Sequence, residues 1–176
     1  MAVSLARRAF LRGGKRSAPE RRPPWTGSDF VDTCVRCDNC IHACPEGILQ
    51  KGDGGFPQIV FEHEGCTFCE ECVRACDEPV FDLARDAFQW QAAIRDNCLA
   101  KAGIHCQSCQ DACEPEAISF RYSVGHVPRP HVDTGSCTGC GACVAVCPQD
   151  AIDLIAPEDV RPDDKTVTLN RGKTDA

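Results

Sequence analysis

The chain has 176 residues, 16 of them cysteine, and a formal net charge of −7. Leu, Ile, Val and Phe together make up only about a fifth of it, a share at which burial of apolar side chains alone barely supports a fold. No run of 18 apolar residues occurs, so we expect no transmembrane helix. The acidic body argues against nucleic acid as a partner, because phosphate binding needs a basic face.

Residues 1–26 are predicted to form a basic N-terminal arm. The first 24 residues contain seven Lys or Arg and a single acid. Residues 7–12 read RRAFLR, which is similar to the core of a twin-arginine export motif, but the apolar segment that a working signal needs does not follow. We therefore expect no export. Residues 12–24 hold three prolines and two glycines, and we expect them to be mobile.

The cysteines fall into four groups of four, and the first cysteines of successive groups are 32, 32 and 39 residues apart. Group one is Cys34, Cys37, Cys40 and Cys44; group two is Cys66, Cys69, Cys72 and Cys76; group three is Cys98, Cys106, Cys109 and Cys113; group four is Cys137, Cys140, Cys143 and Cys147. Such a regular recurrence indicates an internal repeat.

Each repeat is predicted to be a short strand, a cysteine loop, a short helix and another short strand. Strand-like runs precede groups two and four at residues 58–62 and 130–133. One such unit cannot bury a face alone, whereas two facing units can. We therefore predict an α+β fold of two bacterial-ferredoxin-like domains, at residues 27–85 and 96–156. Residues 86–95 would link them as a small helix, and residues 157–176 would form a disordered tail.

Groups one, two and four share the spacing C-x2-C-x2-C-x3-C, which is that of bacterial [4Fe–4S] sites. Two-residue gaps let three thiolates reach three irons of one cube, and Gly139 and Gly141 would help the backbone of group four to wrap. Structural zinc sites instead use paired C-x2-C knuckles far apart, and a disulfide framework would require a secreted chain. The three regular groups therefore predict three [4Fe–4S] clusters.

Group three has the spacing C-x7-C-x2-C-x3-C, so its first cysteine is set back by five residues. A longer loop can still bring Cys98 to a cube, and we predict a fourth cluster here. The alternative is a three-iron cluster or none. His105, next to Cys106, is a possible substitute ligand, but we expect it to be solvated.

The fourth cysteine of each group is expected to ligate the cluster of the neighbouring repeat, as in two-cluster ferredoxins. The predicted ligand sets are Cys34, Cys37, Cys40 with Cys76; Cys66, Cys69, Cys72 with Cys44; Cys98, Cys106, Cys109 with Cys147; and Cys137, Cys140, Cys143 with Cys113. No nucleophile–base pair, phosphate loop or nucleotide fingerprint is apparent. We therefore interpret the chain as an electron carrier that is not itself an enzyme.

The pattern resembles the NapF family of ferredoxin-type proteins, which belong to bacterial periplasmic nitrate reductase systems. The resemblance spans residues 7–155. Its specific features are the twin-arginine-like start, RPPW at 22–25, ILQKGDGGFP at 48–57 and the end of the irregular third group, CQDACEP at 109–115.

This resemblance implies a cytoplasmic accessory protein that binds the catalytic molybdenum subunit of periplasmic nitrate reductase and assists its maturation before export. One alternative is a polyferredoxin electron-transfer subunit of another oxidoreductase complex. A redox or oxygen sensor would need an output domain, and none is visible in the sequence.

Overall fold

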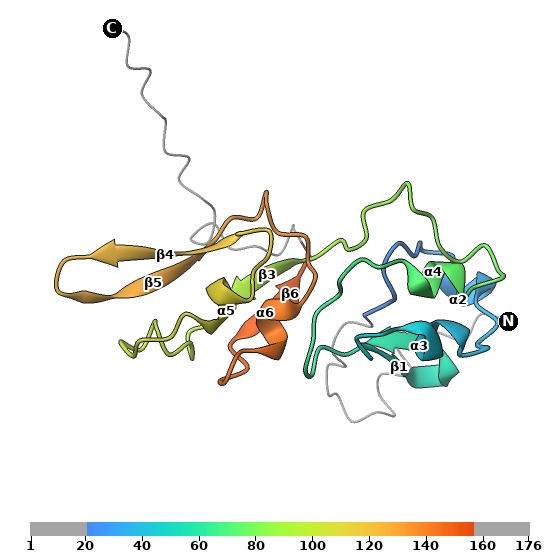
Figure 1. Ribbon diagram of the computed structural model, residues 1–176, viewed down its shortest axis with the longest axis horizontal. Coiled ribbons are helices and arrows are strands. Elements are labelled where there is room, and N and C mark those ends of the chain that lie inside the picture. The colour runs from blue at the N-terminus through green and yellow to red at the C-terminus, as the bar shows by residue number, and fades with distance from the viewer. Residues whose placement is uncertain (1–20, 157–176) are drawn as a thin grey trace, which may run out of the picture.

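A computed structural model describes residues 21–156, which form two lobes side by side (Figure 1). The first half comprises residues 21–85 and the second half residues 91–156, with a connecting segment at 86–90 between them. Most of the predicted basic arm, including its twin-arginine-like run, and the whole predicted tail lie outside the described residues.

The first half contains four short helices or turns of helix around one hairpin. Its elements are α2 (Phe30–Thr33), α3 (Asn39–Ala43), β1 (Leu49–Lys51), the 3-10 turn η1 (Asp53–Gly55), β2 (Pro57–Ile59) and α4 (Glu71–Arg74). Strands β1 and β2 pair antiparallel, with Leu49 opposite Ile59. The chain enters and leaves this half at one place, where Thr26 forms an antiparallel bridge with Phe81.

The second half repeats this plan with longer strands. Its elements are β3 (Gln91–Ile94), α5 (Ser108–Asp111), β4 (Ile118–Ser123), β5 (His126–Val132), α6 (Ala142–Ala145) and β6 (Ile152–Ile155). The first strand, β3, pairs antiparallel with the last, β6. Strands β4 and β5 form a hairpin that projects from the lobe (Figure 1). The predicted mixture of short helices and strands is confirmed, and the strand-like runs at 58–62 and 130–133 overlap β2 and β5.

Two local expectations are wrong. Residues 91–94 of the expected linker helix form strand β3, because their side chains alternate between half-buried and buried and their backbone completes the ladder with β6. The end of the arm, which we expected to be mobile over residues 12–24, is held in place: the Ile59 N–H donates to the carbonyl of Arg21 at 2.7 Å, and the Arg22 guanidinium donates to the carbonyl of Gly27 at 3.0 Å. In both cases the segment ahead of a cysteine group belongs to the half that it precedes.

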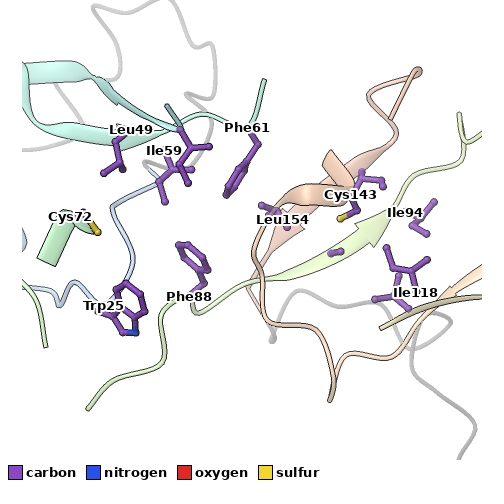
Figure 2. Packing of buried hydrophobic residues seen from close by; sticks show 14 of the residues in the cluster. Trp25, Leu49, Ile59, Phe61, Cys72, Phe88, Ile94, Ile118, Cys143 and Leu154 are labelled. Atoms are coloured by element: carbon purple, nitrogen blue, oxygen red, sulfur yellow. The ribbon is translucent and has the colours of Figure 1, made fainter. Parts of the chain in front are cut away.

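One apolar cluster runs through both halves. It includes Trp25, Leu49, Ile59 and Phe61 from the first half, Phe88 from the connecting segment, and Ile94, Ile118 and Leu154 from the second (Figure 2). Three buried thiols, Cys40, Cys72 and Cys143, are part of it. Helix α3 packs against α4, and α5 against α6. None of the helices within residues 21–156 is long and apolar enough to cross a bilayer.

Candidate metal centres

The cysteines lie in four sets of four, each built from two groups. We name the sets by their residues. Set A is Cys34, Cys37, Cys40 and Cys76; set B is Cys44, Cys66, Cys69 and Cys72; set C is Cys98, Cys106, Cys109 and Cys147; set D is Cys113, Cys137, Cys140 and Cys143. Sets A, B and C each line one small cavity of their own. These are the sets in which crossed ligation is predicted.

Set D is brought together by the packing of two helices. Cys143 lies in α6, Cys113 follows α5, and α5 packs against α6. Burial raises the pKa of Cys143 to about 12, the charges of Cys137 and Cys140 are the next largest causes, and Cys113 also contributes. Each set thus combines three cysteines of one group with the fourth cysteine of the other group in the same half.

Each cysteine loop leads into a short helix that carries the third cysteine of its group. Cys40 lies in α3, Cys72 in α4, Cys109 in α5 and Cys143 in α6. The fourth cysteine follows within two residues of the helix end, as Cys44 follows α3 and Cys147 follows α6. Because the two helices of a half pack together, each places its following cysteine beside the loop of the other.

The three regular loops reverse direction through two residues in the left-handed region, at the positions before and after the second cysteine. These residues are Arg36 and Asp38, Phe68 and Glu70, and Gly139 and Gly141, with φ between 55° and 80°. Glycine accepts this conformation freely, as predicted for group four, whereas other residues pay about 1–2 kcal/mol. The recurrence of this costly turn in all three regular groups fits a loop whose course is set by the site that its cysteines surround.

Group three approaches its site differently. Gln107, which follows its second cysteine, has a φ of −134°, so the left-handed turn is missing there. A left-handed Gly103 instead turns the long loop that returns from Cys98. Cys109 is only half-buried, whereas its counterparts Cys40, Cys72 and Cys143 are buried. The cavity of set C is nonetheless lined by Cys98, and His105 is not among the residues that line it.

Burial and crowding raise the pKa of the inner thiols. Burial is the largest cause, followed by the charges of neighbouring cysteines, and the pKa is about 11 for Cys40, about 12 for Cys72 and about 11 for Cys109. Four thiolates this close repel one another unless a cationic group lies between them. Iron supplies that charge and holds bound thiols deprotonated.

The walls of the cavities are largely apolar, and some backbone amides point at sulfur. Phe30, Val80 and Phe81 line the cavity of set A, and Trp25 and Ile48 that of set B. The Ala151 N–H donates to Cys147 Sγ at 3.2 Å, and the Ala92 N–H to Cys137 Sγ at 3.5 Å. Such N–H···S bonds stabilise a negatively charged cluster. Sequence reasoning missed these wall residues, because single apolar residues carry no motif.

The chemistry and arrangement of the donors fit an iron–sulfur cluster. Among residues 21–156, no three Cys, His, Asp or Glu side chains converge as ligands of a single ion. The thiols of sets A, B and C surround a cavity instead, and in a [4Fe–4S] cluster each thiolate binds an iron of its own. Soft sulfur donors also suit iron–sulfur centres.

Comparison with known proteins supports the same chemistry. Residues 33–81 and 104–151 each match a family described as a 4Fe-4S dicluster domain. The second match begins after Cys98, so that cysteine lies outside it. These matches show that the chain is a [4Fe–4S] protein.

Several curated relatives cover most of the chain. The ferredoxin-type protein NapF of Escherichia coli K12 is 44% identical over 156 residues, 86% of this chain and 95% of that protein. NapF of Haemophilus influenzae Rd is 43% identical, over 86% of this chain and 94% of that protein. The methylamine utilization ferredoxin-type protein MauM of Methylorubrum extorquens is 31% identical over 82% of this chain and 76% of that protein. The chain therefore belongs to the NapF family of ferredoxin-type proteins.

Proposed function

We propose that this protein is an electron carrier with four [4Fe–4S] clusters, one in each of sets A to D, which binds the catalytic molybdenum subunit of a periplasmic nitrate reductase in the cytoplasm and assists its maturation before export. The observation that carries the first part is the assembly of all sixteen cysteines into four sets of four. The second part is supported by membership of the NapF family.

The protein's own residues bind and shield the clusters. A bound [4Fe–4S] cluster takes up and releases one electron at a time. The thiolates fix its position, the apolar walls keep water away, and the amides of Ala92 and Ala151 offset negative charge. Because its relatives are ferredoxin-type proteins, we propose that the protein carries electrons and catalyses no reaction of its own.

A route to a partner exists beside set A. Cys37 is exposed, and Val35, which lines the same cavity, is 57% exposed. Val31, four residues earlier in α2, is also exposed. A partner that covers these two valines would come close to set A without having to open the fold.

The client is tested by capture from cells. An affinity-tagged full-length chain, isolated anaerobically from cytoplasm, should retain the catalytic molybdenum subunit, and a strain without the gene should accumulate immature subunit. Normal maturation in that strain, with no subunit captured, would refute the maturation role. Loss of iron from the isolated chain is a separate question, answered by metal analysis.

A second function is supported by another relative. The chain is 36% identical, over 69% of its length, to one component of an ion-translocating oxidoreductase complex from Methanosarcina acetivorans, and 46% of that component is covered. As an electron-transfer component of such a complex, the protein would stay stably bound and sustain its turnover. Deletion of the gene would then leave client maturation normal and abolish electron supply.

A further inference from the structure

The two halves meet at the cysteine loops of sets B and D. The Cys66 N–H donates to the Cys140 carbonyl at 2.7 Å. The Cys66 and Cys140 side chains are also close: burial is the main cause of the raised pKa of Cys66, and the Cys140 charge adds to it. Sets A and B are complete within the first half, and sets C and D within the second. The bond between the Cys66 and Cys140 loops is therefore not needed to assemble any of the four sets.

The backbones approach as closely as glycine allows. A Cβ on Gly65 would lie 2.6 Å from the backbone nitrogen of Ala142, and a Cβ on Gly141 would lie 2.5 Å from the ring of Phe61. Real Cβ atoms do not tolerate such distances. Each half therefore contributes a glycine that admits a residue of the other. Phe61, labelled in Figure 2, is buried and lies against Gly141.

Aromatic rings brace this contact from the connecting segment. Phe68 of the set B loop lies 5.9 Å, centroid to centroid, from Phe88, which stacks on Trp90 at 4.8 Å. The Trp90 Nε1–H donates to the Gly139 carbonyl at 2.8 Å, within the loop of set D. The rings thus link one cysteine loop to the other and restrict sliding between the halves.

The packing of the helices puts the four sets in an order. Within each half the two sets share both cysteine groups, and the helices that carry their inner thiols pack together, α3 with α4 and α5 with α6. Set A therefore neighbours set B, and set D neighbours set C. The backbone bond from Cys66 to Cys140 joins set B to set D, so the sets follow one another from A to B, from B to D and from D to C.

We propose that the junction of Gly65, Cys66 and Phe61 with Cys140, Gly141 and Ala142 is an electron-transfer contact, which joins the sets in the single order A–B–D–C. This inference rests on the proposed function, because it requires loaded sets. With clusters bound, one electron would leave the cluster held by set B, oxidising it, and would enter the cluster held by set D, reducing it, with no proton moved and no bond formed. An external one-electron donor of low potential supplies it. The rival arrangement is two independent two-cluster carriers on one chain.

The test uses the full chain, loaded anaerobically and reduced with dithionite. Gly65→Ala forces the halves apart at Ala142, and Gly135→Ala is the matched control, since a Cβ there meets only Asp133 at an ordinary 3.4 Å. Iron content, amide hydrogen exchange of the peptide containing Cys66, and magnetic interaction between the reduced sets by electron paramagnetic resonance are measured. If Gly65→Ala loads poorly, Phe61→Leu replaces it.

We expect the wild type and the control to show magnetic interaction across all four sets. With iron retained, Gly65→Ala should exchange the Cys66 amide about tenfold faster and show two separate interacting pairs. Two separate pairs in the wild type, or unchanged interaction in a variant with faster exchange, would overturn the junction as an electron-transfer contact. A chain without iron would instead refute the proposed function.

Discussion

The two halves build the same kind of site from unequal scaffolds. In the first half a single bridge, Thr26 with Phe81, joins the chain ends, and the hairpin β1–β2 is short. In the second half a four-residue ladder, β3 with β6, joins the ends, and β4–β5 projects far beyond the lobe. The crossed sets of cysteines occur in both. Strand length can therefore vary while the helix pairs and their thiols keep their arrangement.

The cysteine loops differ between the halves as well. Both loops of the first half use non-glycine residues with positive φ, whereas group four uses glycines and group three lacks the turn. Cys98 nevertheless lines a cavity of the same kind as the one lined by Cys34. The two halves therefore share the position of the first thiol of the set, whereas the loop that leads to it takes a different path.

Removing a buried thiol should have the largest effect and should act alike in both halves. We predict that Cys40→Ala and, separately, Cys109→Ala each lower the iron content from about 16 to about 12 per chain, because set A or set C loses a ligand. The altered half should also unfold at a lower temperature. Unchanged iron in either variant, measured anaerobically with acid-labile sulfide, would remove that cysteine from the ligands.

The irregular group sharpens the comparison. If Cys98 is the equivalent of Cys34, Cys98→Ala should lose one iron, giving a three-iron cluster, or all four irons of set C. His105→Ala is the matched control and should leave iron unchanged, because His105 does not line that cavity. If His105→Ala lost iron while Cys98→Ala retained it, the histidine would be the ligand in place of the cysteine. Mössbauer spectroscopy distinguishes the cluster types.

Glu70 and Gly141 occupy the same loop position in different halves, both with positive φ. Gly141→Ala should destabilise the protein by about 2–5 kcal/mol, since left-handed strain adds to a clash with Phe61. Glu70→Gly should instead stabilise it by up to about 1 kcal/mol, because relief of strain exceeds the entropy cost of glycine. The free energy of unfolding of both variants is measured anaerobically. A change of the same sign in both variants would contradict the shared loop geometry.

The smallest effect concerns a pair found in the second half. A hydrogen bond from Arg95, opposed by slight desolvation, holds the pKa of Asp153 below its ordinary value. The two side chains are 51% and 38% exposed, so solvent screening limits the pair to about 0.5 kcal/mol. Its contribution is present above the unfolded-state pKa of about 3.9 and is lost only as the pH falls through the lower folded-state value.

Arg95→Gln should therefore cost the same stability at pH 7 and at pH 5, as measured by anaerobic unfolding. Arg85→Gln, which removes an exposed pair with Asp82 at 3.1 Å, is the matched control in the first half. A cost for Arg95→Gln that disappears between pH 7 and pH 5 would show that Asp153 titrates in its ordinary range.

Most of the site could be predicted from the sequence, because cysteine spacing is a direct consequence of cluster geometry. The same reasoning missed the backbone pairing at the start of each half, the Thr26 bridge and strand β3. Thr26 carries no alternating pattern around it, and QAAI at 91–94 follows Phe88 and Trp90, which favour packing in either a helix or a strand. The partners of these residues, Phe81 and β6, lie 55–64 residues away along the chain. Only the folded chain brings them together.

The junction between the halves could not have been found by motif at all. Gly65 and Ala142 belong to different repeats and are ordinary residues of loops. Their importance arises from one close approach of two backbones, which depends on how the halves pack. Sequence periodicity describes each repeat alone and contains no information on that packing.

The most direct test of the account is to prepare the chain anaerobically, measure iron and sulfide, and then remove the iron with a chelator while monitoring compactness. We predict a brown protein with about 16 irons per chain that expands and loses its secondary structure as iron is withdrawn, because thiolate-bound clusters replace a larger apolar core. A colourless, iron-free preparation that stays compact would contradict the account.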